Sequence, residues 1–139
     1  FLSDARWDEE PMRWHDHQLM AAEMGDREGV LMFEETGFVK KGKDAVGVAR
    51  QYCGSLGTVE HCQVGVFAGY ASRHGYALVD KRLFMPEQWF GEDYAPRRAK
   101  CNVPEEVPFH PKPQLAAAML QTIAQEGLRP CKYVVADCL

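Results

Sequence analysis

Two acidic residues, Glu34 and Asp137, each stand at or just after the end of a short apolar run. The runs, 30–33 and 133–136, are typical of buried strands that carry an acid to one edge of a sheet. Two carboxylates there would suit a hard divalent cation, which prefers oxygen ligands and needs only one or two carboxylates. Two such cations support phosphodiester chemistry by activating the attacking oxygen and stabilising the leaving one. An acid at a strand end is also commonly a turn residue or a surface charge, so spacing alone leaves these alternatives open.

The elements that must position these acids follow from hydrophobic patterning and turn residues. The first 26 residues end in a predicted helix over 19–24 that closes near Gly25 and Asp26. An irregular, proline-rich insertion is expected over 85–112, and a helix from Pro113 to a stop at Gly127. Strands are predicted at 29–35, 45–52, 62–71, 76–84 and 133–136.

The order of these elements predicts an α/β fold. Four consecutive strands without a helix indicate an antiparallel meander, whereas a helix between two strands usually makes the last strand parallel to an earlier one. If strand 133–136 lies beside strand 29–35, Asp137 comes next to Glu34. We divide the chain into a helical lead-in, 1–28, and one domain, 29–139.

Composition limits the kinds of protein that this chain can be. Its 139 residues are 46% hydrophobic and 26% charged, which is typical of one globular domain. No apolar stretch is long enough to cross a membrane and nothing at the start is typical of a signal peptide, so we expect a soluble, cytoplasmic protein.

Cysteine and histidine give no clear metal pattern. The five cysteines form no C-x-x-C pair, so we expect free, mostly buried thiols rather than a zinc ribbon or a disulfide framework. A zinc site at His15 and His17, or at His61 beside Cys62, would need regular spacing and a third ligand that the sequence does not offer.

The net charge of −4 hides an asymmetry between the two parts of the chain. Residues 1–36 carry three basic and ten acidic side chains, while residues 37–139 carry thirteen basic and ten acidic ones. Directly after the first strand come Lys40, Lys41, Lys43 and Arg50, with Asp44 the one acid between Gly37 and Gly54. This group is either a solvated turn or a surface that contacts phosphates.

Several adjoining motifs, in order, resemble insertion-sequence transposases with a DDE endonuclease domain on a ribonuclease-H-like fold. The resemblance covers nearly everything from Gly29 to Leu139. The segments that carry it are Glu35–Gly42, Val46–Gly54, Glu60–Val64, Leu83–Trp89, Lys112–Ala116 and Val134–Asp137.

The resemblance implies a mixed sheet with Glu34 and Asp137 as catalytic and metal-binding residues. It implies two Mg²⁺ or Mn²⁺ ions in the complete domain, cleavage of double-stranded DNA at transposon ends, and transfer of the freed 3′ hydroxyl into target DNA. It also implies DNA recombination in a bacterial cytoplasm by a homo-oligomer assembled on DNA.

Two departures from the family pattern matter. Glu34 stands where the family has Asp, and a ligand shift on the order of 1 Å can cost about a hundredfold in rate. The family's third acid lies on a helix further along, and this chain ends at Leu139, so we expect a fragment, with the fold incomplete at the C-terminus and no activity by itself. The alternatives are a non-catalytic DNA-binding remnant and a plain interaction domain.

Three residues or groups have two interpretations. Glu35 is either a stand-in ligand or a cap of a turn at Thr36, and on a strand it faces away from Glu34. Lys40, Lys41, Lys43 and Arg50 would contact DNA phosphates or form a solvated hairpin. Trp89 would stack on an unpaired base or pack the insertion onto the sheet.

Overall fold

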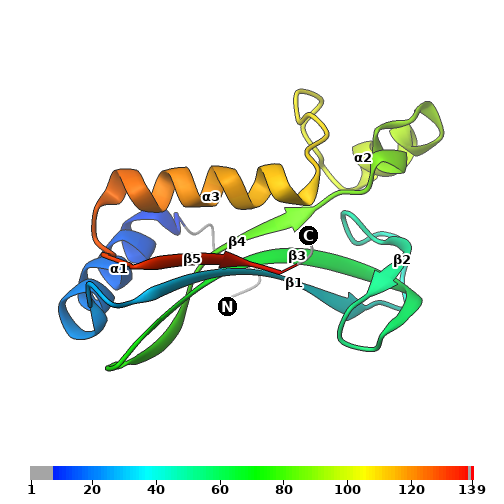
Figure 1. Cartoon of the computed structure of the whole chain (residues 1–139). Helices are drawn as coiled ribbons and strands as arrows, with labels where there is room; N and C mark the ends of the chain where they lie inside the picture. The colour runs from blue at the N-terminus through cyan, green and yellow to red at the C-terminus, as the bar shows by residue number, and fades with distance from the viewer. Residues whose placement is uncertain (1–7, 138) are drawn as a thin grey trace.

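The computed structural model describes residues 8–137 and 139, in which a mixed sheet carries one long helix on one face (Figure 1). In these residues the strands are β1 (Val30–Val39), β2 (Ala49–Cys53), β3 (Thr58–Ser72), β4 (Gly75–Phe84) and β5 (Tyr133–Ala136). The helices are α1 (Glu10–Met24), α2 (Ala95–Lys100) and α3 (Lys112–Glu126), with two short 3₁₀ turns, η1 (Glu87–Phe90) and η2 (Glu92–Tyr94). The expected α/β class with a mixed sheet is therefore confirmed.

The long strand β3 is the centre of the sheet. It pairs antiparallel with β1, with β2 and with β4, while β5 pairs with β1 in the parallel sense. The expected antiparallel meander is wrong in one respect, because β1 pairs with β3 rather than with the strand that follows it. The parallel pairing of the last strand with the first is as expected, since helix α3 spans the crossover between neighbouring parallel strands.

The main core lies between α3 and the sheet. Helix α3 presents Ala116, Met119 and Ile123 at the spacing of one helical face, and all three are buried. The sheet residues packed with them are Leu31, Phe33, Val66, Ala68, Tyr70 and Val79. Pro113 lies in the first turn of α3, and Gly127 ends the helix at φ +65°, a conformation that glycine adopts without strain.

Strand β1 is longer than its predicted end at Glu35. It runs on through Thr36 and Gly37 to Val39, pairing with β3 throughout. The segment around Cys53 crosses β1 at Gly37, where an added Cβ would lie 2.6 Å from the Cys53 sulfur. Glycine therefore marks a close crossing here and not the turn that the sequence indicated.

Other boundaries also differ from expectation. Strand β2 begins at Ala49, because residues 40–48 form a loop, and the insertion expected to be irregular contains η1, η2 and α2. Helix α1 begins nine residues before its expected start at Leu19 and ends at Met24, with Gly25 as its C-cap. It lies along β4 and the C-terminal end of α3.

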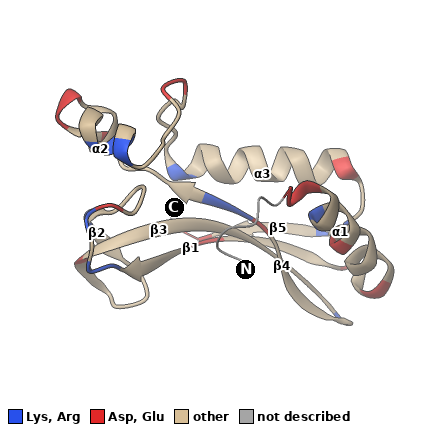
Figure 2. Ribbon diagram, turned by 180° about the vertical axis from the view of Figure 1, so that it is seen from behind, with Lys and Arg blue, Asp and Glu red and all other residues tan. Residues whose placement is uncertain are grey.

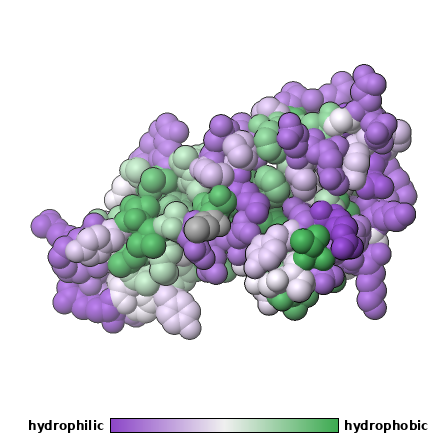
Figure 3. Space-filling view, turned by 45° about the vertical axis from the view of Figure 1, so that its right-hand side comes forward, coloured by the Kyte–Doolittle hydropathy of each residue, from purple (hydrophilic) through white to green (hydrophobic). Residues whose placement is uncertain are grey.

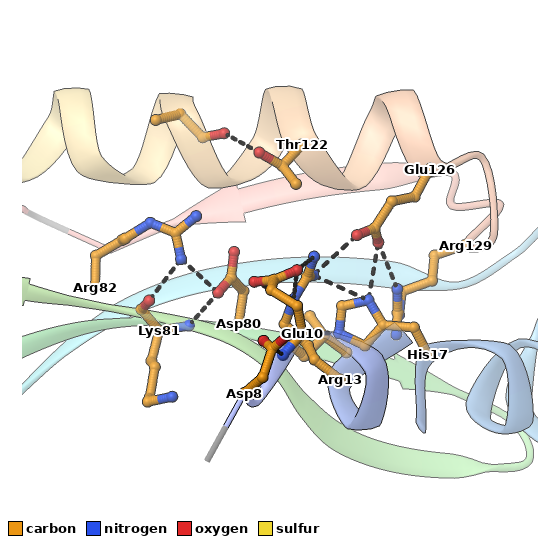
Figure 4. A network of polar contacts seen from close by, with 12 residues as sticks. Asp8, Glu10, Arg13, His17, Asp80, Lys81, Arg82, Thr122, Glu126 and Arg129 are labelled. Atoms are coloured by element: carbon orange, nitrogen blue, oxygen red, sulfur yellow. Dashed lines mark hydrogen bonds and ion pairs between the residues drawn. The ribbon is translucent and has the colours of Figure 1, made fainter. Parts of the chain in front are cut away.

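A polar network fixes α1 (Figure 4). His17 is buried, donates from Nε2 to the carbonyl of Val79 at 2.8 Å, and has Nδ1 2.9 Å from a carboxylate oxygen of Glu126. Arg13 donates to the other oxygen of Glu126 at 2.9 Å. His17 is thus a structural residue that joins α1, β4 and α3.

The thiols are free where the structure describes them. Cys53 and Cys62 are buried, whereas Cys101 and Cys131 are half-buried, and Cys138 lies outside the described residues. Burial raises the pKa of the Cys62 thiol. Within residues 8–137 and 139, no helix is long and apolar enough to cross a membrane.

Candidate functional site

The pairing of β1 with β5 places Glu34 beside Asp137. The last paired residues are Phe33 and Ala136, and the backbone N–H of Asp137 donates to the carbonyl of Phe33 at 3.1 Å. This bond continues the parallel ladder to the point where Glu34 and Asp137 are opposite each other. The fold thus brings together two acids that are about a hundred positions apart in the sequence.

Glu34 lies on the face of the sheet opposite α3. Its neighbours Leu31 and Phe33 are buried under the helix, and side chains alternate between the two faces of a strand. The Glu34 side chain is exposed and lines a hollow of about 480 Å³. Apolar residues form most of this hollow, which is bounded by Met32, Phe38, Phe67, Tyr76 and Leu78.

Apolar surface continues around this face and along β5. Large exposed side chains include Met32 and Phe38 on β1 and Tyr133, Val134 and Val135 on β5. Apolar residues also gather in patches between hydrophilic areas on the side of the molecule shown in Figure 3.

Glu35 takes neither of its two expected roles. It lies on the α3 side of the sheet, where Lys112 at the start of α3 forms an ion pair with it, and 16% of its side chain is exposed. Strand β1 continues past Thr36, so there is no turn for Glu35 to cap. Lys112 also lies 5.2 Å from the ring centre of Phe84. The Glu35 carboxylate therefore faces away from Glu34 and is held by a lysine.

The donor set at Glu34 and Asp137 fits a hard cation in part. Two carboxylates suffice for Mg²⁺, which keeps several water ligands. Among residues 8–137 and 139, no group of three or more His, Cys, Asp or Glu side chains is placed to hold a metal. Within the described part of the chain, the site would consist of these two acids.

The four basic residues predicted to contact DNA lie at one end of the molecule. Lys41 and Lys43 are exposed in the loop between β1 and β2, Lys40 is half-buried there, and Arg50 is exposed on β2. Figure 2 shows basic residues around β2 and on α2 at this end. The acids at Glu34 and Asp137 lie further back along β1 and β5.

The loop that carries the lysines is tied to the sheet. Gln63 donates from its side chain to the carbonyl of Val46 at 2.6 Å, and His61 donates to the carbonyl of Gly42 at 3.0 Å. The backbone N–H of Lys40 donates to the carbonyl of His61 at 3.0 Å. The loop therefore holds its lysines on a defined backbone, unlike a freely moving solvated turn.

Trp89 packs the insertion against this loop. Its side chain is completely buried, and its indole N–H donates to the carbonyl of Val48 at 2.8 Å. The structure thus supports the packing role and is incompatible with stacking of Trp89 on a base. Two further basic residues lie at this end, Arg97 and Lys100 on α2, and the sequence did not single them out.

Comparisons with known proteins show the family of this chain. A family model for DDE superfamily endonucleases matches residues 1–139. The chain belongs to the DDE superfamily of endonucleases. This confirms the resemblance that the motifs carried.

One relative of this DDE endonuclease segment is a probable transposase. The chain is 29% identical over 144 residues to the probable transposase for insertion sequence element IS701 of Microchaete diplosiphon. The alignment covers all of this chain and 33% of that protein, so the DDE segment described here spans about a third of the relative's length. No solved structure matches the chain.

Proposed function

We propose that this chain supplies two metal-binding acids and a DNA-contacting surface to a transposase that cuts and joins DNA. The observation that carries the proposal is the juxtaposition of Glu34 and Asp137 by the β1 and β5 pairing. Membership of the DDE endonuclease superfamily and the likeness to a probable transposase support it. The substrate would be double-stranded DNA at transposon ends and at the target.

In this proposal Glu34 and Asp137 hold Mg²⁺ or Mn²⁺. Such ions, when bound, supply Lewis-acid stabilisation of charge on phosphate oxygens. The chain's own residues position the acids: β1 fixes Glu34 on the open face, and the ladder from Phe33 fixes the backbone of Asp137. Strand alternation puts Glu35 on the other face, where Lys112 pairs with it, so one acid of the Glu34 and Glu35 pair faces the site.

The basic loop would hold the DNA backbone. Lysine and arginine contacts to phosphates position a duplex without reading its sequence. Lys41 and Lys43 are exposed on a loop that hydrogen bonds hold in place, which lowers the entropy cost of ordering them on DNA. We also propose that 1–28 is a lead-in to the catalytic segment and that the working enzyme is a homo-oligomer.

Metal binding tests the proposal. Mn²⁺ titration of the chain, followed by electron paramagnetic resonance, should show a site that is lost in Glu34→Gln and in Asp137→Asn. Glu23→Gln, which changes an exposed carboxylate on α1, is the matched control and should bind as the unaltered chain does. Equal binding in all four proteins would overturn the metal site.

A second measurement separates the enzyme from a non-catalytic remnant. DNA binding by the chain, together with loss of binding in Lys41→Gln, would support a DNA surface whether or not metal binds. If DNA binds but the metal titration shows no specific site, the remnant interpretation replaces the enzyme. If neither ligand binds, a plain interaction domain is the better description.

A further inference from the structure

Helix α2 is attached to the loop that carries the predicted DNA contacts. Lys100 on α2 donates to the Asp44 carboxylate at 2.6 Å, and the Cys101 thiol donates to the Asp44 carbonyl at 3.0 Å. Trp89, in the same insertion, donates to Val48 at the end of that loop. The insertion and the loop, far apart in sequence, therefore form one surface.

Arg97 is held at the same surface by aromatic rings. Its guanidinium carbon lies 4.7 Å from the ring centre of Tyr94 and 5.9 Å from that of Trp89. Stacking of this kind orients the guanidinium while leaving its N–H donors available to a phosphate. Arg98 differs, because it donates to the carbonyls of Trp89 and Gly91 and so stabilises the insertion itself.

The charges at this junction are unequally distributed. The loop and α2 carry four cations here, Lys41, Lys43, Arg97 and Lys100, and the loop carries one carboxylate, Asp44, which pairs with Lys100. Lys100 and then Arg97 hold the pKa of Asp44 below its usual range, although burial opposes this. In Figure 2 the acidic residues of the insertion lie at its outer end beside α2 and at the top of the loop that leads to α3, and basic residues lie on α2 near β2.

We propose that α2 extends the DNA-contacting surface of the β1 to β2 loop, with Arg97 and Lys100 binding phosphates in competition with Asp44. The inference rests on the proposed function, because it takes double-stranded DNA as the ligand. Asp44 takes the place of a phosphate in the free protein. It holds Lys100 by an ion pair, which breaks when a DNA phosphate binds Lys100.

Charge complementarity makes a duplex backbone the fitting occupant. The cations come from two segments that Lys100 and Asp44 join, so they present several charges to a polyanion. Each phosphate neutralised releases counterions and contributes about 0.9 to the slope of log affinity against log salt. Between about 50 and 200 mM salt, a variant that lacks one phosphate contact should therefore lose affinity by a factor roughly threefold smaller than the unaltered chain does.

The test measures binding of a fluorescent duplex of arbitrary sequence by anisotropy, with the 139-residue chain, across that salt range. Lys100→Gln and Arg97→Gln should each weaken binding and lower the salt slope by about one. Asp44→Asn should strengthen binding and steepen the slope, because it removes the competing carboxylate. Lys100→Arg should restore the slope, since it keeps the charge.

The ion pair of Lys132 with Glu28 offers matched controls. It has the same 2.6 Å separation as the pair of Lys100 with Asp44, but it lies at the start of β1 and β5. Lys132→Gln and Glu28→Gln should leave the salt slope unchanged. Thermal unfolding of each variant checks that a change in slope comes from charge and not from loss of the fold.

The outcomes distinguish this inference from the proposed function. One outcome would overturn the role of α2 and leave the loop as the DNA surface. In it, Lys41→Gln weakens binding, whereas Lys100→Gln and Arg97→Gln bind as the control Lys132→Gln does. An unaltered chain that fails to bind the duplex at low salt would overturn both. An Asp44→Asn variant no tighter than Glu28→Gln would overturn the competition by Asp44.

Discussion

Lys112, in the first turn of α3, forms an ion pair with Glu35 in the middle of β1. Both side chains are mostly buried, with 21% and 16% exposed, and the lysine also lies over the ring of Phe84. The pair joins the helix to the strand that carries Glu34. Strand alternation places Glu35 on the covered side with Leu31 and Phe33, and the ion pair holds its carboxylate there.

Breaking this pair should destabilise the fold and leave the candidate metal site in place. Lys112→Met keeps the apolar stem over Phe84 but leaves the Glu35 carboxylate without its partner. We expect the free energy of unfolding to fall by about 1–3 kcal/mol, measured in urea. Glu35→Gln should cost a similar amount while Mn²⁺ binding persists. Loss of Mn²⁺ binding in Glu35→Gln with the fold intact would mean that Glu35 is a ligand.

The length of the side chain at position 34 should affect catalysis. In a longer transposase chain that carries this segment, Glu34→Asp removes the extra methylene and should raise the rate of strand cleavage, by up to about a hundredfold. Cleavage of a labelled transposon-end duplex in Mg²⁺ measures this. An unchanged rate would indicate that the longer side chain reaches the same position.

Acid should weaken the attachment of α1. Burial raises the pKa of Glu126, but hydrogen bonds from His17 and Arg13 outweigh this, so the pKa of Glu126 lies below its ordinary value of 4.5. A carboxyl with a lowered folded-state pKa stabilises the protein above its unfolded pKa, and this stability is lost as pH falls through the folded pKa. The free energy of unfolding should therefore decrease below about pH 4.5.

The Glu126→Gln variant isolates this effect. It should be less stable than the unaltered chain by about 3 kcal/mol at pH 7, because buried Arg129 and His17 lose their carboxylate partner. Its stability should also change less between pH 7 and pH 3. Glu105→Gln, an exposed change in the insertion, should keep the full acid dependence. Parallel curves for the unaltered chain and Glu126→Gln would contradict the role of this group.

Gly37 should not tolerate a side chain. A Cβ there would lie 2.6 Å from the sulfur and 3.1 Å from the Cα of Cys53, so the crossing segment would have to move. We expect Gly37→Ala to lower the free energy of unfolding by about 1–3 kcal/mol. Gly54→Ala is the control, because nothing lies within 4 Å of the added Cβ. Equal stability of the two variants would show that the crossing is not tight.

The sequence predicted the features that depend on local pattern and on rules of connection. The spacing of Leu115, Met119 and Ile123 indicated α3, and the helix before the last strand indicated its parallel pairing beside Glu34. That pairing is confirmed. The roles of Glu34 and Asp137 as ligands stay a prediction.

The features that the sequence could not predict depend on contacts between distant segments. Gly37 was interpreted as a turn because the approach of Cys53 leaves no local pattern. The early start of α1 depends on His17 meeting Glu126, 109 positions away. The partner of Glu35 lies 77 positions away. Propensity and periodicity report on neighbours along the chain, so such contacts appear only in the folded structure.

The parallel pairing of β5 with β1 also affects the order in which the site can form. The strand that carries Glu34 leaves the ribosome before its partner, which follows only after β2, β3, β4, the insertion and α3. Closing a contact over so many residues is slow compared with forming hairpins. A nascent chain that has not yet released β5 cannot bring the two carboxylates together, so in this fold the acid pair is assembled only after these other elements have been synthesised.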